Sequence, residues 1–248
     1  MLGIYRASLL TACLVLTACS TTIQTMPHPA IEPQPIATEI ELEQLAWWRL
    51  RFKLNWPEDE SPDLSGHLLL AEQVLLPLLV EHQEELRLWR FHRRAGRDDS
   101  GNQFSLIFLA DPLTAERINE QVSADAFTVW LQSAGMLERT RFGRDGKGDT
   151  ARFEETSDRA WPEEIQESWP WFIMGASQAW LMHLQAISNE QGLSDSMDYE
   201  TLIKHYADVA SVMNAQWRDN AQHAYFHHLS AIYGYQPVKL RSAELKQF

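Results

Sequence analysis

The sequence predicts an α+β fold: a split βαβ, or ferredoxin-like, antiparallel sheet with helices on one face, followed by a C-terminal helical bundle. Two observations predict it. Apolar and basic residues alternate along two segments of strand length, 46–54 and 86–94, and a leucine-rich segment at helical spacing separates them. The order strand, helix, strand, strand, helix then opens a split βαβ unit, and from Ser168 onward the pattern is helical.

The first two predicted strands each have one apolar and one basic face. In residues 46–54 the even positions are apolar, and in residues 86–94 Trp89 and Phe91 are expected to point inward. The outward face of both strands consists of Arg49, Arg51, Lys53, Arg90, His92 and Arg94. This face is a local inversion of charge in an acidic chain, so it suits a carboxylate, a phosphate or an acidic peptide. Pairing with acidic neighbours, such as the 154–167 segment, is the alternative.

The remaining elements of the sheet region follow from spacing and turn signals. Residues 64–86 are predicted to form a helix that Pro77 bends, and residues 96–102 form a turn before a third strand at 103–110. Asp111-Pro112 opens a helix that runs to about Val122, and residues 126–137 form another. Residues 139–155 suggest a β-hairpin whose first arm completes the sheet.

Three further helices are predicted after the sheet region. The segment Trp171–Ile187 is apolar on most sides, so we expect it to be buried, while Gln178, His183 and Gln185 argue against a membrane span. A stripe at helical spacing runs from Tyr199 to Trp217, and a last helix covers residues 219–233. The sheet region is thus expected at 39–155 and a helical region packed on it at 156–248.

The amino-terminal residues predict export and lipidation. Residues 1–18 read as a short signal peptide, and Leu16-Thr17-Ala18-Cys19 resembles the lipobox of bacterial lipoproteins. The resemblance implies a diacylglyceryl thioether on Cys19 and an acyl chain such as palmitate on its amino group, which together hold a protein stably on a membrane. Ser20, in place of Asp, favours the periplasmic side of the outer membrane. A plain signal peptide cut elsewhere is the alternative.

Composition limits what the exported chain can be. Residues 19–38 are rich in Pro and Thr and are expected to be a linker. Removing the signal takes away only Arg6 and leaves 20 basic against 34 acidic residues, which argues against a nucleic-acid partner. Cys13 and Cys19 are the only cysteines, so no disulfide is expected. Walker, dinucleotide and nucleophile-elbow motifs are missing, so no cofactor is expected.

Residues at both ends of the globular part resemble a known family. The three segments that carry the resemblance are Trp89-Arg90-Phe91-His92-Arg93-Arg94, Gln103-Phe104-Ser105-Leu106-Ile107-Phe108 and, late in the chain, residues 226–234. Together they resemble the C-terminal domain of lantibiotic dehydratases and thiopeptide-type bacteriocin biosynthesis proteins. That family eliminates glutamate from glutamylated Ser or Thr, using strand arginines and a histidine of its last helix. Only Arg93 and His228 match those positions, because Ser105 and Ile107 replace two of the arginines and Ser230-Ala231 an Asn-Arg pair.

Two functional hypotheses follow. The leading one is a non-catalytic envelope lipoprotein that binds or assembles with an envelope protein, because the tether and linker are present and most of the family's cationic residues are not. The alternative is an enzyme with His228 as acid/base and Arg93 as anion clamp. His223 and His227, one helical turn apart, are weak candidates for metal ligands, since a zinc site needs a third ligand.

Overall fold

The computed structural model describes residues 45–59, 61–62, 64–145, 156–193 and 197–236. The predicted signal peptide, Cys19 and the linker lie outside the described residues, as does the second arm of the predicted hairpin at 151–153. All described residues belong to one compact unit, Ile36–Phe248. No helix in this described part is both long and apolar enough to cross a membrane.

Four antiparallel strands form the sheet, and their order confirms the predicted fold class. They are β1 (Ala46–Leu54), β2 (Leu88–Ala95), β3 (Asn102–Ala110) and β4 (Leu137–Arg144), arranged as β2-β3-β1-β4. The strand β1 lies inside the sheet, antiparallel to β3 on one side and to β4 on the other. The split βαβ order places β3 between β1 and β2, so the first and second strands of the sequence share a sheet without touching.

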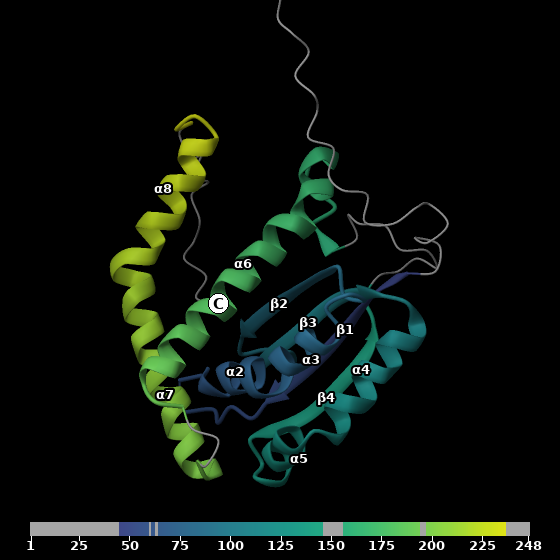
Figure 1. Cartoon of the computed structure of the whole chain (residues 1–248), viewed down its shortest axis with the longest axis vertical. Helices are drawn as coiled ribbons and strands as arrows, with labels where there is room; N and C mark the ends of the chain where they lie inside the picture. Colours follow the sequence, from purple (N-terminus) through teal and green to yellow (C-terminus); the bar gives the residue numbers. More distant parts are fainter. Residues whose placement is uncertain (1–44, 60, 63, 146–155, 194–196, 237–248) are drawn as a thin grey trace, which may run out of the picture. The chain divides into compact units, whose positions relative to one another are not determined.

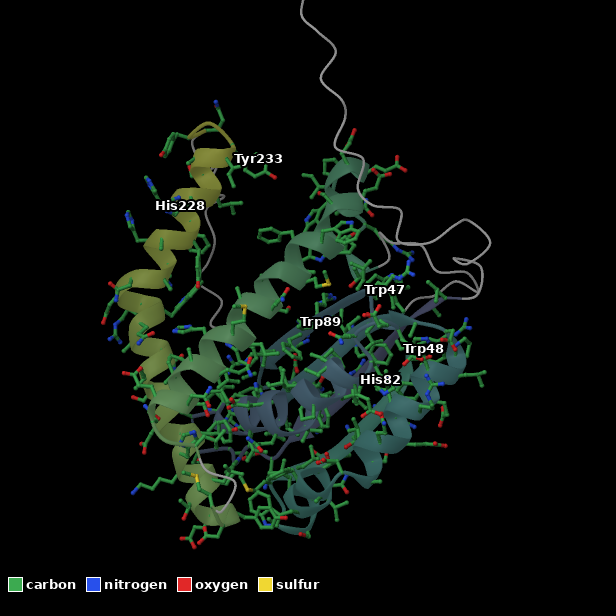
Figure 2. All side chains as sticks on the ribbon, viewed as in Figure 1. Trp47, Trp48, His82, Trp89, His228 and Tyr233 are labelled. Carbon is green, nitrogen blue, oxygen red and sulfur yellow. The ribbon has the colours of Figure 1, made fainter. Side chains whose placement is uncertain are left out.

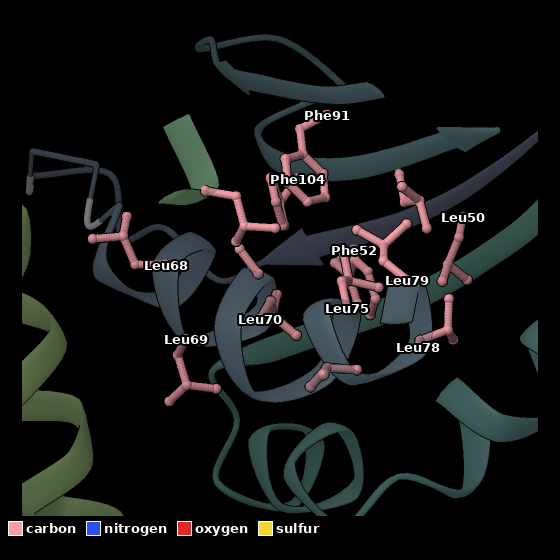
Figure 3. Packing of buried hydrophobic residues seen from close by; sticks show 14 of the residues in the cluster. Leu50, Phe52, Leu68, Leu69, Leu70, Leu75, Leu78, Leu79, Phe91 and Phe104 are labelled. Carbon is pink, nitrogen blue, oxygen red and sulfur yellow. The ribbon is translucent and has the colours of Figure 1, made fainter. Parts of the chain in front are cut away.

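Helices cover one face of this sheet (Figure 1). They are α2 (Ser65–Leu69), α3 (Leu76–Glu81), α4 (Pro112–Ala124) and α5 (Ala126–Ser133), with a π-helical segment, η1 (Leu70–Leu75), between α2 and α3. Phe52, Phe104 and Leu75 are fully buried where α2, η1 and α3 pack on the strands (Figure 3). Burying side chains of this size stabilises the fold by about 1.5–3 kcal/mol each.

The predicted helix at 64–86 differs in two ways from the observed one. It ends at Glu81, and before Pro77 it widens into the π segment where a bend was expected. Proline has no N–H to donate and its ring crowds the preceding turn, so one wide turn relieves the conflict. The helix predicted at 126–137 ends at Ser133, because Gly135 takes a left-handed φ of 70° before β4 begins.

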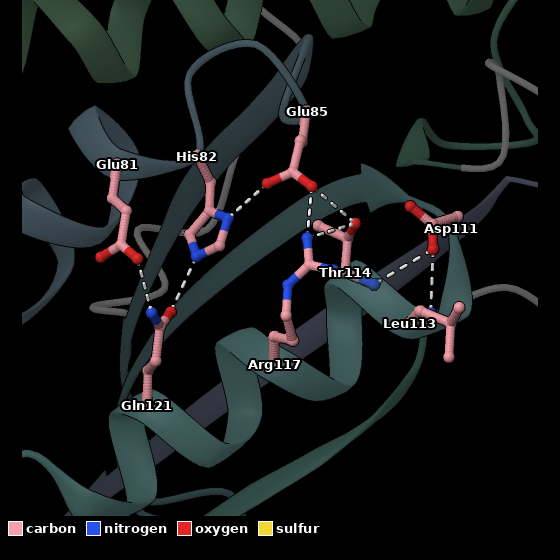
Figure 4. A network of polar contacts seen from close by, with 8 residues as sticks. All are labelled: Glu81, His82, Glu85, Asp111, Leu113, Thr114, Arg117 and Gln121. Carbon is pink, nitrogen blue, oxygen red and sulfur yellow. Dashed lines mark hydrogen bonds and ion pairs between the residues drawn. The ribbon is translucent and has the colours of Figure 1, made fainter.

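A polar cluster fixes α4 to the end of α3. His82, at the end of α3, contacts Glu85 (2.6 Å) and Gln121 of α4 (2.7 Å), and Glu85 also binds Arg117 (Figure 4). Burial lowers the pKa of His82, but the hydrogen bonds with Glu85 and Gln121 and the charge of Glu85 outweigh it and raise the pKa overall. These contacts join the α3–β2 loop to α4.

The three C-terminal helical segments differ in how they pack. The helix α6 (Glu163–Glu190) lies along the edge strand β2, where the Phe91 N–H donates to Ser177 Oγ at 3.1 Å. The helix α7 (Tyr199–Gln216) packs against α2 and α6, and the buried Tyr206 hydroxyl donates to Glu72 at 2.9 Å. A second π segment, η3 (Trp217–Ala221), leads into α8 (Gln222–Ile232), and neither contains a buried residue.

The expectation that Trp171–Ile187 is buried as a whole is wrong. Only a stripe of α6, including Ser177, Leu181 and Leu184, is buried, whereas Trp171 and Phe172 are 40% and 50% exposed. One side of α6 packs against β2 and α7, and no second layer of described residues covers its amino-terminal half. The apolar residues on its other side therefore remain on the surface.

Candidate functional site

Strand register gathers the basic residues on the sheet face opposite the core helices. All six predicted residues of β1 and β2 lie on this face, and β4 adds Arg139 and Arg141. Arg51 is directly opposite Arg141, and Lys53 is directly opposite Arg139. The two β4 arginines were not among the predicted site residues, because the first arm of the hairpin at 139–155 was expected to complete the sheet but its neighbouring strand was not identified. Their alternation with Thr140 and Phe142 was the available signal.

One end of the basic face is covered. A small buried cluster lies there, with Met174 of α6 packed against it. Its members are the strand residues Trp47, Leu88, Ile107 and Leu109. Beside this cluster, Arg90 Nε donates to Thr156 Oγ1 at 2.7 Å, and burial lowers the pKa of Arg90 to about 10. Arg49 forms an ion pair with Asp145 at 2.6 Å. Arg90 and Arg49 therefore act as structural residues that join the sheet to neighbouring segments.

The other end of the face is open and contains a cavity of about 200 Å³. It is lined by Arg51, Lys53, Asp99, Ser100, Gln103, Arg139 and Arg141. Glu138 pairs with Lys53 at 2.8 Å and with Arg139 at 3.5 Å, so one carboxylate serves two of the cations. Arg94, at the same end of β2, pairs with the exposed Asp98. The four cations of the lining therefore exceed the acidic groups that face them.

We call this cavity the open basic site. Its least neutralised part is the pair of opposed arginines, Arg51 and Arg141. Neither Arg51 nor Arg141 forms an ion pair with a side chain in the described part of the chain. Partial burial and the charges of Arg49 and Arg141 lower the pKa of Arg51, and the negative charge of Asp145 offsets them only in part. Like charges directly opposite on neighbouring strands repel each other. An anion between the two guanidinium groups removes this repulsion and accepts their hydrogen bonds.

Arg93 lies on the opposite face of the sheet from the open basic site. Its Nε donates to His67 Nδ1 at 3.2 Å, and its guanidinium lies over the Trp180 ring at 5.1 Å from the centroid. Burial lowers the pKa of Arg93 to about 10; burial, followed by the charge of Arg93, keeps the pKa of His67 well below its usual value. Arg93 thus has a packing role in the core, with an imidazole and an indole as its contacts.

His228 lies on α8, well apart from the sheet residues Trp47 and Trp89 (Figure 2). It lines a groove between α6 and α8, and Arg93 is absent from the lining of that groove. The structure therefore does not bring the two candidate catalytic residues into a shared cavity. The His223 and His227 rings stack on α8 with centroids 5.3 Å apart, and within the described residues no group of three potential ligands surrounds them.

Comparisons with protein families, with characterised proteins and with solved structures give no significant match. The resemblance to lantibiotic dehydratases therefore stays a prediction from the quoted motifs. Since a ferredoxin-like sheet hosts many activities, the function has to be argued from the site itself.

Proposed function

We propose that the chain is a lipid-anchored, non-catalytic binding module of the cell envelope, and that its open basic site receives one anionic group of a partner protein. The single observation that carries this proposal is the opposition of Arg51 and Arg141 across an open cavity, where neither forms an ion pair within the described residues. Guanidinium groups present paired N–H donors that match carboxylate and phosphate oxygens.

The size of the cavity favours a single group over a whole small molecule. Ligand pockets that enclose a small molecule measure about 300–1,000 Å³. The open basic site measures about 200 Å³, which suits one carboxylate or phosphate at the end of a larger partner. Neighbouring cations such as Arg94 then contact further acidic groups of the same partner.

The chemistry of the lining favours binding over catalysis. General acid–base catalysis near neutral pH needs a group such as histidine or a shifted carboxyl within reach of the reacting atoms. The described lining contains no histidine, cysteine or tyrosine, and its one carboxylate is Asp99. Arginine and lysine side chains hold an anion in place, but they transfer protons poorly at neutral pH.

The lipid anchor on Cys19 is supported by the lipobox resemblance of residues 16–19. Two or three acyl chains exceed what stable membrane attachment requires. The Pro-rich linker, at about 3.1 Å per residue in extended geometry, allows the domain to work roughly 60 Å from the bilayer. A tethered domain with an anion-binding face is suited to hold a partner at the periplasmic side of the outer membrane. Mass spectrometry of the native amino terminus tests the anchor, which an unmodified thiol would rule out.

Titration of the purified full chain with inorganic phosphate and with a short glutamate-rich peptide tests the binding site. We expect both probes to bind, and the double variant Arg51→Gln/Arg141→Gln to lose at least about 10-fold in affinity, since each charge-assisted hydrogen bond contributes about 1.5–3 kcal/mol. The control is Lys204→Gln, which removes one positive charge from the exposed surface of α7. Equal losses in both variants, or no binding by the wild type, would contradict the proposal.

A further inference from the structure

A second surface feature is independent of the open basic site: an apolar groove of about 680 Å³ between α6 and α8. Its aromatic walls include Trp171 and Phe172 on α6 and Trp217 and Phe226 on the η3–α8 segment. The lining contains no Asp, Glu, Lys or Arg. The whole of residues 168–189 and 220–236 also contains no Asp, Glu, Lys or Arg, although such residues make up 22% of the chain. The α6 and α8 sides of the groove therefore contain histidine as their only ionisable side chain of basic type.

The helix α8 lacks a covering layer in the part of the chain that the structure describes. None of the residues of η3 and α8 is buried, and Phe226 and Ile232 are 60% and 80% exposed. The 11 residues of α8 continue the helical backbone of α7 through η3, since the residues at both junctions have αR dihedral angles. Because most helical stability comes from packing an apolar face, the apolar side chains of this extension need a covering surface that the described part of a single chain does not supply.

Gly175 marks where the covering surface approaches α6. Glycine in a helix interior is destabilising relative to alanine, and a Cβ built at Gly175 meets nothing within 4 Å in the described structure. The packing of a single chain thus gives no reason for glycine here. Gly175 and Ala179 both line the groove, four residues apart on one side of α6. Small residues at this spacing allow the backbone of a second helix to come close.

We propose that a second copy of this chain fills the groove, with α8 of each copy lying in the α6–α8 groove of the other. The contact between the two copies is two-fold symmetric and self-complementary. In each copy α8 forms one wall of its own groove and also fills the groove of the other copy. The result is an intermolecular bundle of two α6 and two α8 helices.

The exposed apolar area is sufficient for such a dimer. Eight large side chains of this region are each 40–80% exposed. Six line the groove, namely Trp171, Phe172, Trp217, Tyr225, Phe226 and Ile232, and two, Tyr233 and Tyr235, lie at the end of α8. At roughly 200 Å² for each such side chain, they offer on the order of 900 Å² per copy. A standard stable interface buries about 800 Å² per partner. An acyl chain or a foreign helix is the competing occupant.

Native mass spectrometry of the purified full chain distinguishes these occupants, because it reports both the number of chains and the mass of any bound lipid. We expect a dimer at micromolar concentration. Two variants, Gly175→Leu and Ile232→Asp, should each weaken it at least about 30-fold, as expected for a central interface position. Both positions are open or exposed in one chain, so unchanged circular dichroism should accompany the loss.

The matched control is Leu113→Asp, because Leu113 is 76% exposed on α4, outside the groove. It should leave the dimer intact, and so should Arg141→Gln in the open basic site. A wild-type chain that stays monomeric, a monomer that carries a non-covalently bound lipid besides the acyl chains proposed on Cys19, or a dimer that resists both groove variants would each overturn the proposal. None of these results depends on whether the open basic site binds an anion.

Discussion

The substitution Arg141→Gln is expected to stabilise the fold while weakening anion binding. Arg141 is exposed on β4 directly opposite Arg51, and neither forms an ion pair within the described residues. Two unit charges roughly 7 Å apart repel by about 0.6 kcal/mol in bulk water and by about 2.4 kcal/mol at an effective dielectric constant of 20. Because Arg141 is exposed, the lower end applies; opposite-charge pairs across strands contribute about 0.2–1 kcal/mol, and like charges in the same position are destabilising.

We therefore expect the free energy of unfolding to rise by about 0.5 kcal/mol in low salt without ligand, which raises Tm by roughly 1–2 °C for a chain of this size. The pKa of Arg51 should move back toward its ordinary value, because one of the charges that lower it is gone. At about 1 M salt, where the Debye length is about 3 Å, the stability difference should disappear.

The order of stabilities should reverse when phosphate is added. A ligand that binds only the folded state stabilises it by about RT ln(1 + [L]/Kd), so the tighter binder gains more. Losing one charge-assisted contact of about 1.5–3 kcal/mol weakens binding roughly 10- to 100-fold. Urea denaturation with and without phosphate measures both effects, with Lys204→Gln as the control. If Arg141→Gln is less stable than wild type without ligand, or if phosphate stabilises both chains equally, the reasoning about the opposed arginines fails.

Three other predictions concern stability and are measured by urea denaturation. Ser177→Ala removes the acceptor of the Phe91 N–H at the edge of β2, and should cost about 1–3 kcal/mol; an unchanged midpoint would mean that water replaces the hydroxyl. Asp111→Ala removes the N-cap of α4, whose carboxylate accepts from Leu113 N at 2.9 Å, and should cost about 1 kcal/mol, with Asp111→Asn restoring most of it. The raised pKa of His82 means that protonated His82 stabilises the fold below about pH 6.5, and this stabilisation is lost as pH rises through the folded-state pKa. The lowered pKa of Glu85 acts in the other direction: its stabilisation is lost as pH falls through the folded-state pKa of Glu85. His82→Gln should therefore cost more near pH 5.5 than near pH 8.5, and an equal cost at both would contradict this assignment.

Much of the sheet and the apolar–basic division of its strands could be predicted from the sequence. The alternation along residues 46–54 defines a strand with one apolar and one basic face whatever strand lies beside it, because successive side chains in a strand point to opposite sides. Asp111-Pro112 likewise marked the start of α4, because an N-cap depends on residues within one turn. Such local signals set the fold class without knowledge of the packing.

Only the tertiary structure decided which of the basic residues form a site. The pairing of β4 with β1 places Arg141 opposite Arg51, and α6 with the segment around Thr156 covers the end of the face that holds Arg90. Both results depend on contacts between residues far apart in the chain, such as Arg51 with Arg141 and Arg90 with Thr156, and residue periodicity carries no information about such contacts. The sequence thus determined that a basic face exists, and long-range packing determined that one end of it is covered and the other is open.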